Sequence, residues 1–528
     1  MKTSRWTRGL GAAGLALMMC GVAACVSDAE PSGGPSGSVE IDPAATVRVA
    51  WAGPPTNLDP HRQVSPADMP YSSLIYDRLT RMSPDGNKVL PMLAESWTFS
   101  PDGKRLELKL RTDVTFHDGT KFTSAVVKTN LERGKSVAGT TVAPDLASIA
   151  SIDTPDDATV VLNLSSGGAA LPVAFTTNVG EMVSPKALAD GRDLKLAPGD
   201  AGSGAYKLAD LRPNESATFE RVDNYWDDSV QRAKTIAITV STAASGINGL
   251  RAGQFDLVQV TIGPDTQPTL DGAKAGGYEV YVKDVRGSHT LMLNSAKPPL
   301  DNLKLRQAIQ FAIDRDAIGN QLYQGQCAPS YQPFGSGNPA HNAEVDSGYA
   351  FNLDKAKQLL AESGLANPTF DIEFGPAHKV TAEAVQAQLT SAGINAQLKP
   401  VPQGEVSPRF NGGEAMATLT GIVPGADGST YVSRYVLGGA TISRGGDPAQ
   451  VARVKTLAAE ALDPTLSEAD RGTKYQEIQG VVAAQAWSVQ VCSARQLWAH
   501  NAKMVGVDDT MPGIWAALPE FDRLAKAR

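Results

Sequence analysis

The sequence PMLAESWTFSPDGKRLELKLRTDVTFHDGTKFTSAVVKTNLER, residues 91–133, alternates strand and turn patterns before it ends in a helical one. Residues 96–99 are expected to form one strand. Within residues 106–110, three leucines alternate with charged side chains, which is typical of a strand with one buried and one solvent-facing side. Asp-Gly pairs on either side of that strand favour turns. We expect a helix that is capped by Thr123 and runs to Arg133.

Outside this stretch, strand and helix patterns alternate along the chain. Thr46–Trp51 has the alternating, β-branched character of a strand, and residues 71–79 are expected to form a short helix. Apolar residues recur on one helix face within residues 305–313 and again within residues 356–364, where the final glycine is expected to end the helix. Residues 385–401 begin as a helix and finish as a strand. This alternation predicts α/β lobes whose leucines form the core.

These blocks together resemble the extracytoplasmic solute-binding proteins of peptide-type importers, the dipeptide, oligopeptide and nickel group of the ATP-driven uptake systems. Residues 91–133 look like the signature region of this family. Four further blocks follow in the family's order, namely GSGAYKLADLRPNESATFERVDNYW (202–226), LRAGQFDLV (250–258), LMLNSAKPPLDNLKLRQAIQFAIDRDAI (291–318) and FNLDKAKQLLAESG (351–364). The resemblance extends from about residue 46 to the C-terminus.

The resemblance implies an α/β, two-lobed fold of the periplasmic-binding-protein type. In such proteins the chain crosses twice between the lobes, and a solute is trapped in the cleft as the lobes close. We expect the crossings near residues 284–289 and 487–492. The expected parts are lobe one at 46–284 with an extra subdomain at about 61–185, lobe two at 288–488, and a return to lobe one at 490–528.

The same resemblance implies a monomeric binding protein that captures a peptide or another small polar solute and delivers it to the permease subunits of an ABC importer. A sensor or adhesion lipoprotein with the same fold and a secreted hydrolase are the alternatives. The chain contains no H-E-x-x-H, C-x-x-C or G-x-S-x-G motif, and its six histidines are scattered. We therefore expect no catalytic residue, no metal, no cofactor and no enzymatic activity.

The first residues have the three parts of a secretory signal. Basic residues are followed by an uncharged run, Gly9–Ala24, which is shorter than the roughly 20 residues of a membrane-spanning helix. Val22-Ala23-Ala24-Cys25 resembles the lipobox of bacterial lipoproteins. This implies a signal peptide at residues 1–24 and a diacylglycerol anchor, with palmitate among its acyl chains, on Cys25 at the outer side of the cell membrane. Residues 25–45 are expected to be a flexible linker. The other interpretation is a cleaved, freely secreted protein.

Composition is that of an ordinary globular protein, with 42% hydrophobic and 20% charged residues. The net charge of −8 argues against a nucleic-acid partner. Besides Cys25, a processed chain would keep two cysteines, Cys327 and Cys492. Since thiols outside the cytosol can form disulfides, we favour a bond between them over two buried free thiols.

The stretch ATLTGIVPGADGSTYV, residues 417–432, bears on the choice of solute. In peptide-binding members of the resembled family, an aspartate in the corresponding loop meets the α-ammonium of the solute. Thr420 and Gly421 align with that pattern, but Ile422 stands at the aspartate position and Asp427 falls near a later Asp-Pro. The loop predicts that a free α-ammonium group is not bound in this way unless Asp427 takes the role of the missing aspartate. A modified or glycan-linked peptide, a metal chelate or another small polar solute remains open.

Four further positions are candidates for ligand binding. Lys379 lies near the place where some family members have a cation for the carboxylate end of the solute, although a solvated lysine at a helix start is the other interpretation. Trp51 and Trp487 are candidates for apolar cleft walls, with core packing as the alternative. Gly53 lies in the loop after the first predicted strand.

Overall fold

The computed structural model describes residues 40–63, 66–84, 86, 88–228, 230, 232–260, 262–263, 265–438, 441–508 and 519–528. The chain divides into two compact units, Met1–Glu40 and Ile41–Arg528, and the second carries the fold described below. The signal peptide and Cys25 lie outside the described residues. Among the helices of the described part, none combines the length and the apolar character that a membrane crossing requires.

Unit Ile41–Arg528 is built around one eleven-stranded sheet. Its strands follow the order β15-β14-β16-β12-β17-β11-β1-β10-β9-β8, and β13 pairs with β17 beside this path. The strands are β1 Thr46–Trp51, β8 Tyr206–Arg212, β9 Ser216–Arg221, β10 Thr235–Val240, β11 Leu257–Val260, β12 Glu279–Leu293, β13 Cys327–Pro329, β14 Thr369–Phe374, β15 Asn395–Pro400, β16 Ala417–Ile422 and β17 Ser488–His500.

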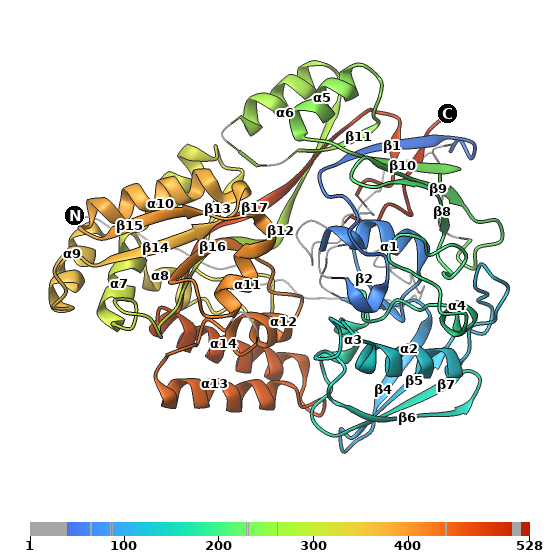
Figure 1. Ribbon diagram of the computed structural model, residues 1–528, viewed down its shortest axis with the longest axis horizontal. Coiled ribbons are helices and arrows are strands. Elements are labelled where there is room, and N and C mark those ends of the chain that lie inside the picture. Colours follow the sequence, from blue (N-terminus) through green and yellow to red (C-terminus); the bar gives the residue numbers. More distant parts are fainter. Residues whose placement is uncertain are drawn as a thin grey trace, which may run out of the picture. The chain divides into compact units, whose positions relative to one another are not determined.

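Two long antiparallel strands, β12 and β17, join the halves of this sheet. The early residues of β12 pair with the late residues of β17, next to β11, whereas residues 288–293 of β12 also pair with β16. Figure 1 shows both strands passing between β14–β16 and β1, β10 and β11. The register between β12 and β17 is irregular between Asp284 and Ser288. The mixed α/β, two-lobed fold agrees with the prediction, while the exact lobe boundaries stay a prediction.

A second, four-stranded sheet in the order β4-β5-β7-β6 contains the stretch at residues 91–133. Its strands are β4 Ala94–Phe99, β5 Arg105–Leu110, β6 Ile149–Asp156 and β7 Thr159–Leu164. The three leucines of β5 are buried in one apolar cluster, as their alternation predicts. Helix α2, Ser124–Ser136, follows Thr123 but runs three residues beyond Arg133, and the Thr123 side chain makes no capping hydrogen bond. Two small hairpins pair β2 Thr80–Met82 with β3 Val89–Pro91, and β18 Met504–Val505 with β19 Ala525–Lys526.

Helix α1, Met69–Ile75, ends earlier than predicted. The expected helix at residues 71–79 is wrong beyond Ile75 because tertiary contacts hold the next residues in another conformation. The buried carboxylate of Asp77 accepts hydrogen bonds from Ser203, Tyr225 and Trp226 at 2.7–2.9 Å. Such long-range hydrogen bonds outweigh local helix propensity.

The remaining helices cover the sheets. They are α3 Leu171–Ala174, α4 Pro185–Ala189, α5 Ala243–Arg251, α6 Thr266–Ala275, α7 Leu303–Ala312, α8 Val345–Gly348, α9 Leu353–Glu362, α10 Lys379–Ser391, α11 Val406–Asn411, α12 Ser429–Tyr431, α13 Pro448–Ala461 and α14 Glu468–Ala484, with π-helical turns at Ala317–Leu322 and Val432–Val436. Helices α7, α9 and α10 pack on the β12–β16 half of the main sheet in one apolar cluster. Gly364, just beyond α9, has a φ of +71°, which explains why a glycine ends that helix.

Candidate functional site

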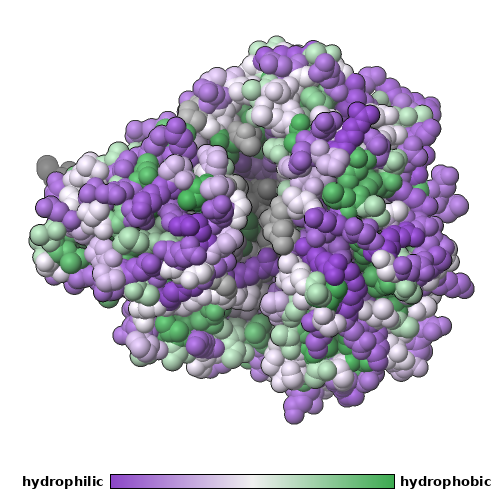
Figure 2. Space-filling view, in the orientation of Figure 1, coloured by the Kyte–Doolittle hydropathy of each residue, from purple (hydrophilic) through white to green (hydrophobic). Residues whose placement is uncertain are grey.

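A cavity of about 290 Å³ lies between residues 144–177 and residues 425–475, two segments that are far apart in the sequence. The first segment includes α3, and the second includes α12, the π-helical turn after it and parts of α13 and α14. Figure 2 shows one face of unit Ile41–Arg528, which is hollowed near its middle and has hydrophilic residues among those on the rims of the hollow. A concave site between segments of one chain is where proteins bind small ligands.

Small, hydroxyl-bearing and aliphatic side chains line the cavity, and its two charged lining residues are Asp145 and Arg434. Arg434 Nη2 lies 3.6 Å from Asp145 Oδ2, and the two side chains are 42% and 25% exposed. Burial raises the pKa of the Asp145 carboxyl, and the neighbouring Arg434 guanidinium opposes that rise. An acid from one segment therefore forms an ion pair with a base from the other in a partly desolvated position.

The loop at residues 425–431 is shaped by a glycine that approaches an aromatic ring. Gly428 has a φ of +91°, and a Cβ placed there would come within 2.8 Å of the Tyr475 ring. Tyr475 lines the cavity, and its hydroxyl is buried without a hydrogen-bond partner among the described residues. A buried hydroxyl is costly to leave unpaired, so this polar group next to the cavity is unusual.

The predicted positions on β16 have distinct surroundings. Thr420 and Gly421 lie opposite Thr290 and His289 of β12, and Gly421 is exposed. Ile422 is 2% exposed and packs in an apolar cluster that includes α13 and α14 residues. The end of β16 therefore carries no acidic group.

Asp427 is committed to its own turn. Its Oδ1 accepts hydrogen bonds from the Ser429 amide at 3.0 Å and from the Ser429 hydroxyl at 2.6 Å. Gly425 and Ser429 on either side line the cavity, whereas Asp427 is not among its lining residues.

The two candidate tryptophans are core residues. Trp51 is 3% exposed and stacks on Trp498 with ring centroids 5.9 Å apart. Trp487 is fully buried, and Gly446 lies so close to its ring that a Cβ there would come within 2.6 Å. In this structure neither ring presents a face to a solute, because sheet and helix packing covers both.

Lys379 and Gly53 also lie apart from the cavity lining. Lys379 begins α10 with a side chain that is 67% exposed, and its Nζ lies 3.8 Å from Glu383 Oε1. The Gly53 carbonyl accepts a hydrogen bond from the Tyr71 hydroxyl at 2.8 Å. The sequence analysis missed Asp145, Arg434 and Tyr475, since nothing local distinguishes these residues from other surface acids, bases and aromatics.

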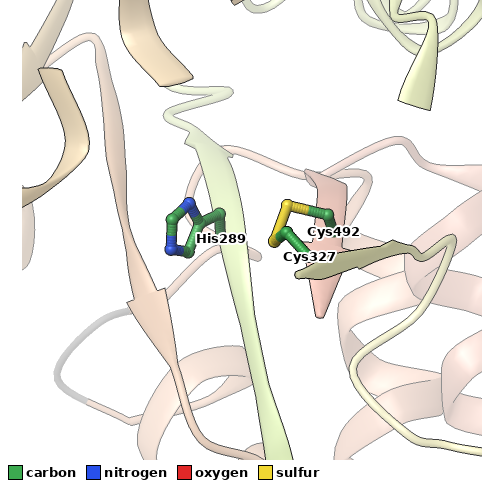
Figure 3. Close-up of side chains that lie close together, drawn as sticks. All are labelled: His289, Cys327 and Cys492. Atoms are coloured by element: carbon green, nitrogen blue, oxygen red, sulfur yellow. A yellow bond between two sulfur atoms is a disulfide. The ribbon is translucent and has the colours of Figure 1, made fainter. Parts of the chain in front are cut away.

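Cys327 and Cys492 form a disulfide with Cα atoms 5.3 Å apart, in agreement with the favoured pairing. The bond connects β13 to β17 where β17 also pairs with β12. His289 of β12 lies beside it (Figure 3). The ring centroid of His289 is 4.8 Å from that of His378, and burial lowers the pKa of the two imidazoles to about 3 and about 4.

Comparisons with known proteins agree with this architecture. The model of the family described as bacterial extracellular solute-binding proteins, family 5 middle, matches residues 88–443. Heme-binding protein A of Haemophilus influenzae is 25% identical over 66% of this chain and 69% of its own. Glutathione-binding protein GsiB of Escherichia coli is 25% identical over 85% of this chain and 89% of its own. The structure of AgaA, a PBP from A. tumefaciens R10 in complex with agropinic acid, is similar with a TM-score of 0.79 and 25% identity, over 92% of this chain and 99% of that one.

Proposed function

Since the chain belongs to the bacterial extracellular solute-binding proteins of family 5, we propose that it captures a small solute bearing both a positive and a negative group in the cavity between residues 144–177 and 425–475. The family serves ABC importers, so the solute is passed on unchanged to a permease. The named relatives differ in what they bind, from heme to glutathione to agropinic acid. The choice of solute must therefore be argued from this chain's own residues.

One observation carries the proposal. Asp145 and Arg434, the two charged residues of the lining, form an ion pair at 3.6 Å that connects the two walls of the cavity. A solute that bears both charges can replace this ion pair with two new ones, its cationic group at Asp145 and its anionic group at Arg434. Charge-assisted hydrogen bonds of this kind are stronger in a partly desolvated space than in water. The serine and threonine side chains of the lining supply further polar contacts.

The residues at the end of β16 support the proposal that the ammonium group of the solute is bound differently here than in the dipeptide-binding proteins of the family. Ile422 is buried among apolar side chains, and the Asp427 carboxylate already accepts two hydrogen bonds from Ser429. A buried ammonium without a partner would be costly. We therefore place the cationic group of the solute at Asp145, with Asp427 as the alternative partner.

Native mass spectrometry of freshly purified protein identifies a solute that is retained through purification. Calorimetry with that solute then compares Asp145→Asn with Asp427→Asn, which removes the same charge from a loop that borders the cavity without lining it. We expect Asp145→Asn to weaken binding at least tenfold. Loss of one partner of a buried charge pair typically costs about 2–5 kcal/mol, and the partial exposure of Asp145 places the expected loss at the lower end of that range. Asp427→Asn should change the affinity by less than about threefold. The reverse order of effects would move the ammonium site to Asp427.

We also propose that the protein is a lipoprotein on the outer side of the cell membrane. The lipobox-like residues 22–25 and the Gly/Ser/Pro-rich residues 25–45 support an anchored body on a linker. Co-purification with permease subunits would separate this importer role from a sensor or adhesion role. A turnover assay on the retained solute tests the expectation that the protein is not an enzyme.

A further inference from the structure

A second zone of contact connects residues 82–173 with residues 426–465, apart from the long strands β12 and β17. In the wall of the cavity, the Ala169 amide donates a hydrogen bond of 3.2 Å to the Leu462 carbonyl. A Cβ placed on Gly167 would lie 2.3 Å from the oxygen of the same carbonyl. Gly167 and Leu462 both line the cavity. Two backbones from distant parts of the sequence therefore meet here without a side chain between them.

Gly167 is needed for this contact and not for its own backbone conformation. Its φ is not among the positive values that favour glycine, so alanine can adopt the same conformation. The three atoms nearest to a Cβ at this position all belong to Leu462, and two of them are backbone atoms. Any larger residue at position 167 would therefore push the two segments apart.

Two further contacts between the same segments are also uncharged. Gly103, in the turn between β4 and β5, is buried beneath the loop that connects α13 to α14. A Cβ there would lie 3.0 Å from the Pro464 ring and 3.2 Å from Thr465 Cγ2. Met82 of β2 packs against Ala426, which follows β16, in a small apolar cluster. Since these contacts involve no charge, salt does not screen them.

The ion pair of Asp145 and Arg434 cannot hold the segments together in the same way. Under the proposed function, on which this inference rests, the solute binds these two residues separately, so the direct ion pair between the segments is lost. Other contacts must then connect the segments around the bound solute. The uncharged contacts remain available, because none of their atoms belongs to a charged side chain.

We propose that these uncharged contacts form a clamp that holds the two segments together around the solute and separates when the solute leaves. The clamp consists of Gly167 and Ala169 against Leu462, Gly103 against Pro464 and Thr465, and Met82 against Ala426. Because both segments line the cavity, their separation opens it. Small contacts of this kind open locally at a lower free-energy cost than a long strand pairing such as that of β12 with β17.

Hydrogen–deuterium exchange of the Ala169 amide reports on the clamp, because that N–H is bonded to Leu462 when the clamp is formed. The full-length protein is measured as purified and again after unfolding in urea, dialysis and refolding, which removes a retained solute. Native mass spectrometry gives the solute occupancy of each sample, and overlapping peptides resolve residue 169. We expect exchange at least about tenfold faster in the solute-free sample. A contact with a purely structural role would exchange equally in both.

Gly167→Ala disrupts the clamp sterically. The Ala169 amide of this variant should exchange at least about tenfold faster than that of the wild type as purified, while the amides of β5 keep their rates. Gly335→Ala is the matched control and should change nothing, since Gly335 is exposed, has no positive φ and would place its Cβ more than 4 Å from other heavy atoms beyond its chain neighbours.

A second variant covers the case in which Gly167→Ala does not fold, as circular dichroism would show. Pro464→Ala removes the ring carbons that cover Gly103 and should also speed exchange at residue 169. Salt separates the clamp from the ion pair. At 1 M NaCl the Debye length falls to about 3 Å, which weakens the partly exposed pair of Asp145 and Arg434 but should leave the protection of the Ala169 amide unchanged.

Three results would overturn the proposal. The first is equal exchange at residue 169 in the two wild-type samples, and the second is wild-type exchange in folded Gly167→Ala. The third is loss of protection at high salt, which would assign the connection to the ion pair. Failure of the proposed solute contacts is a separate result, because Asp145→Asn would then bind solute normally while the clamp still protects the Ala169 amide.

Discussion

Ile422 shows how one side chain constrains ligand choice. At 2% exposure it belongs to the core rather than to a polar cleft, so an acid there would be buried without a partner. The substitution Ile422→Asp should therefore destabilise the fold before it creates an ammonium site. Asp145, on the opposite segment, supplies the negative charge where the chain has room for a solute.

Cys25→Ala tests the anchor. Removal of the thiol that would carry the lipid should move the protein from the membrane fraction to the soluble fraction. Acyl chains contribute about 0.8 kcal/mol per buried CH₂, and more than one is needed for stable anchoring. Fractionation after a high-salt wash measures the result, and Cys20→Ala is the matched control because Cys20 lies outside the lipobox-like residues. A variant that stays with the membrane would show that another feature anchors the chain.

Leu108→Ala tests the core of the four-stranded sheet. Leu108 is 1% exposed in β5, and loss of a buried leucine side chain typically costs about 2–5 kcal/mol of unfolding free energy. Glu107→Ala is the neighbouring control: its carboxylate forms only an exposed ion pair with Lys109, so a change within about 0.5 kcal/mol is expected. Urea denaturation of both variants checks the difference. Equal losses would mean that the strand's two faces are not distinguished by burial.

The strands of residues 91–133 were predictable because their alternation is local and directly reflects one-sided burial. Helix α1 was not, because the hydrogen bonds that hold Asp77 come from residues 203–226 and leave no trace in the local pattern. The cavity could not be predicted from the sequence, since Asp145 and Arg434 come together only in the tertiary structure. In the sequence alone, neither residue differs from an ordinary charged surface residue.

The connection of β13 to β17 gives a prediction about stability. Closing a loop over a sequence separation of 165 residues restricts the unfolded chain and should stabilise the fold by up to about 5 kcal/mol in the chain-entropy model. Cys327→Ser/Cys492→Ser should therefore lower the denaturant midpoint. The denaturant midpoint of this double variant is compared with the midpoints of oxidised and of freshly reduced wild-type protein. A double variant as stable as the oxidised protein would contradict the chain-entropy explanation.

Across the molecule, buried acids predict how stability depends on pH. Burial raises the pKa of Glu181 to about 8, against a hydrogen bond from Ser72 and the charge of Arg78, while Glu520 and Asp68 add to the rise. A group with a raised folded-state pKa stabilises the protein fully below its unfolded-state pKa of 4.5, and this contribution is lost as the pH rises toward 8. The contribution of Glu181 to the unfolding free energy should therefore fall between about pH 5 and about pH 8.

Glu181→Gln isolates that contribution. The neutral amide cannot ionise in the unfolded chain, so the decline over this pH range should become shallower by about 1 kcal/mol per pH unit. Urea denaturation at several pH values measures the slope, with the exposed Glu107→Gln as a control that keeps the wild-type slope. An unchanged slope in Glu181→Gln would show that this carboxyl is ionised in the folded protein.

The continuous main sheet also has a consequence for association between copies of the chain. Because β12 and β17 run through both halves, the path of strands ends only twice, at β15 and at β8. Unpaired strand edges are templates for aggregation, and charged side chains or proline discourage it. β15 ends at Pro400, and β8 carries Asp210 and Arg212, with side chains 61% and 70% exposed. Within the described residues, both ends of the main sheet's path thus carry residues that resist edge-to-edge pairing with a neighbouring molecule.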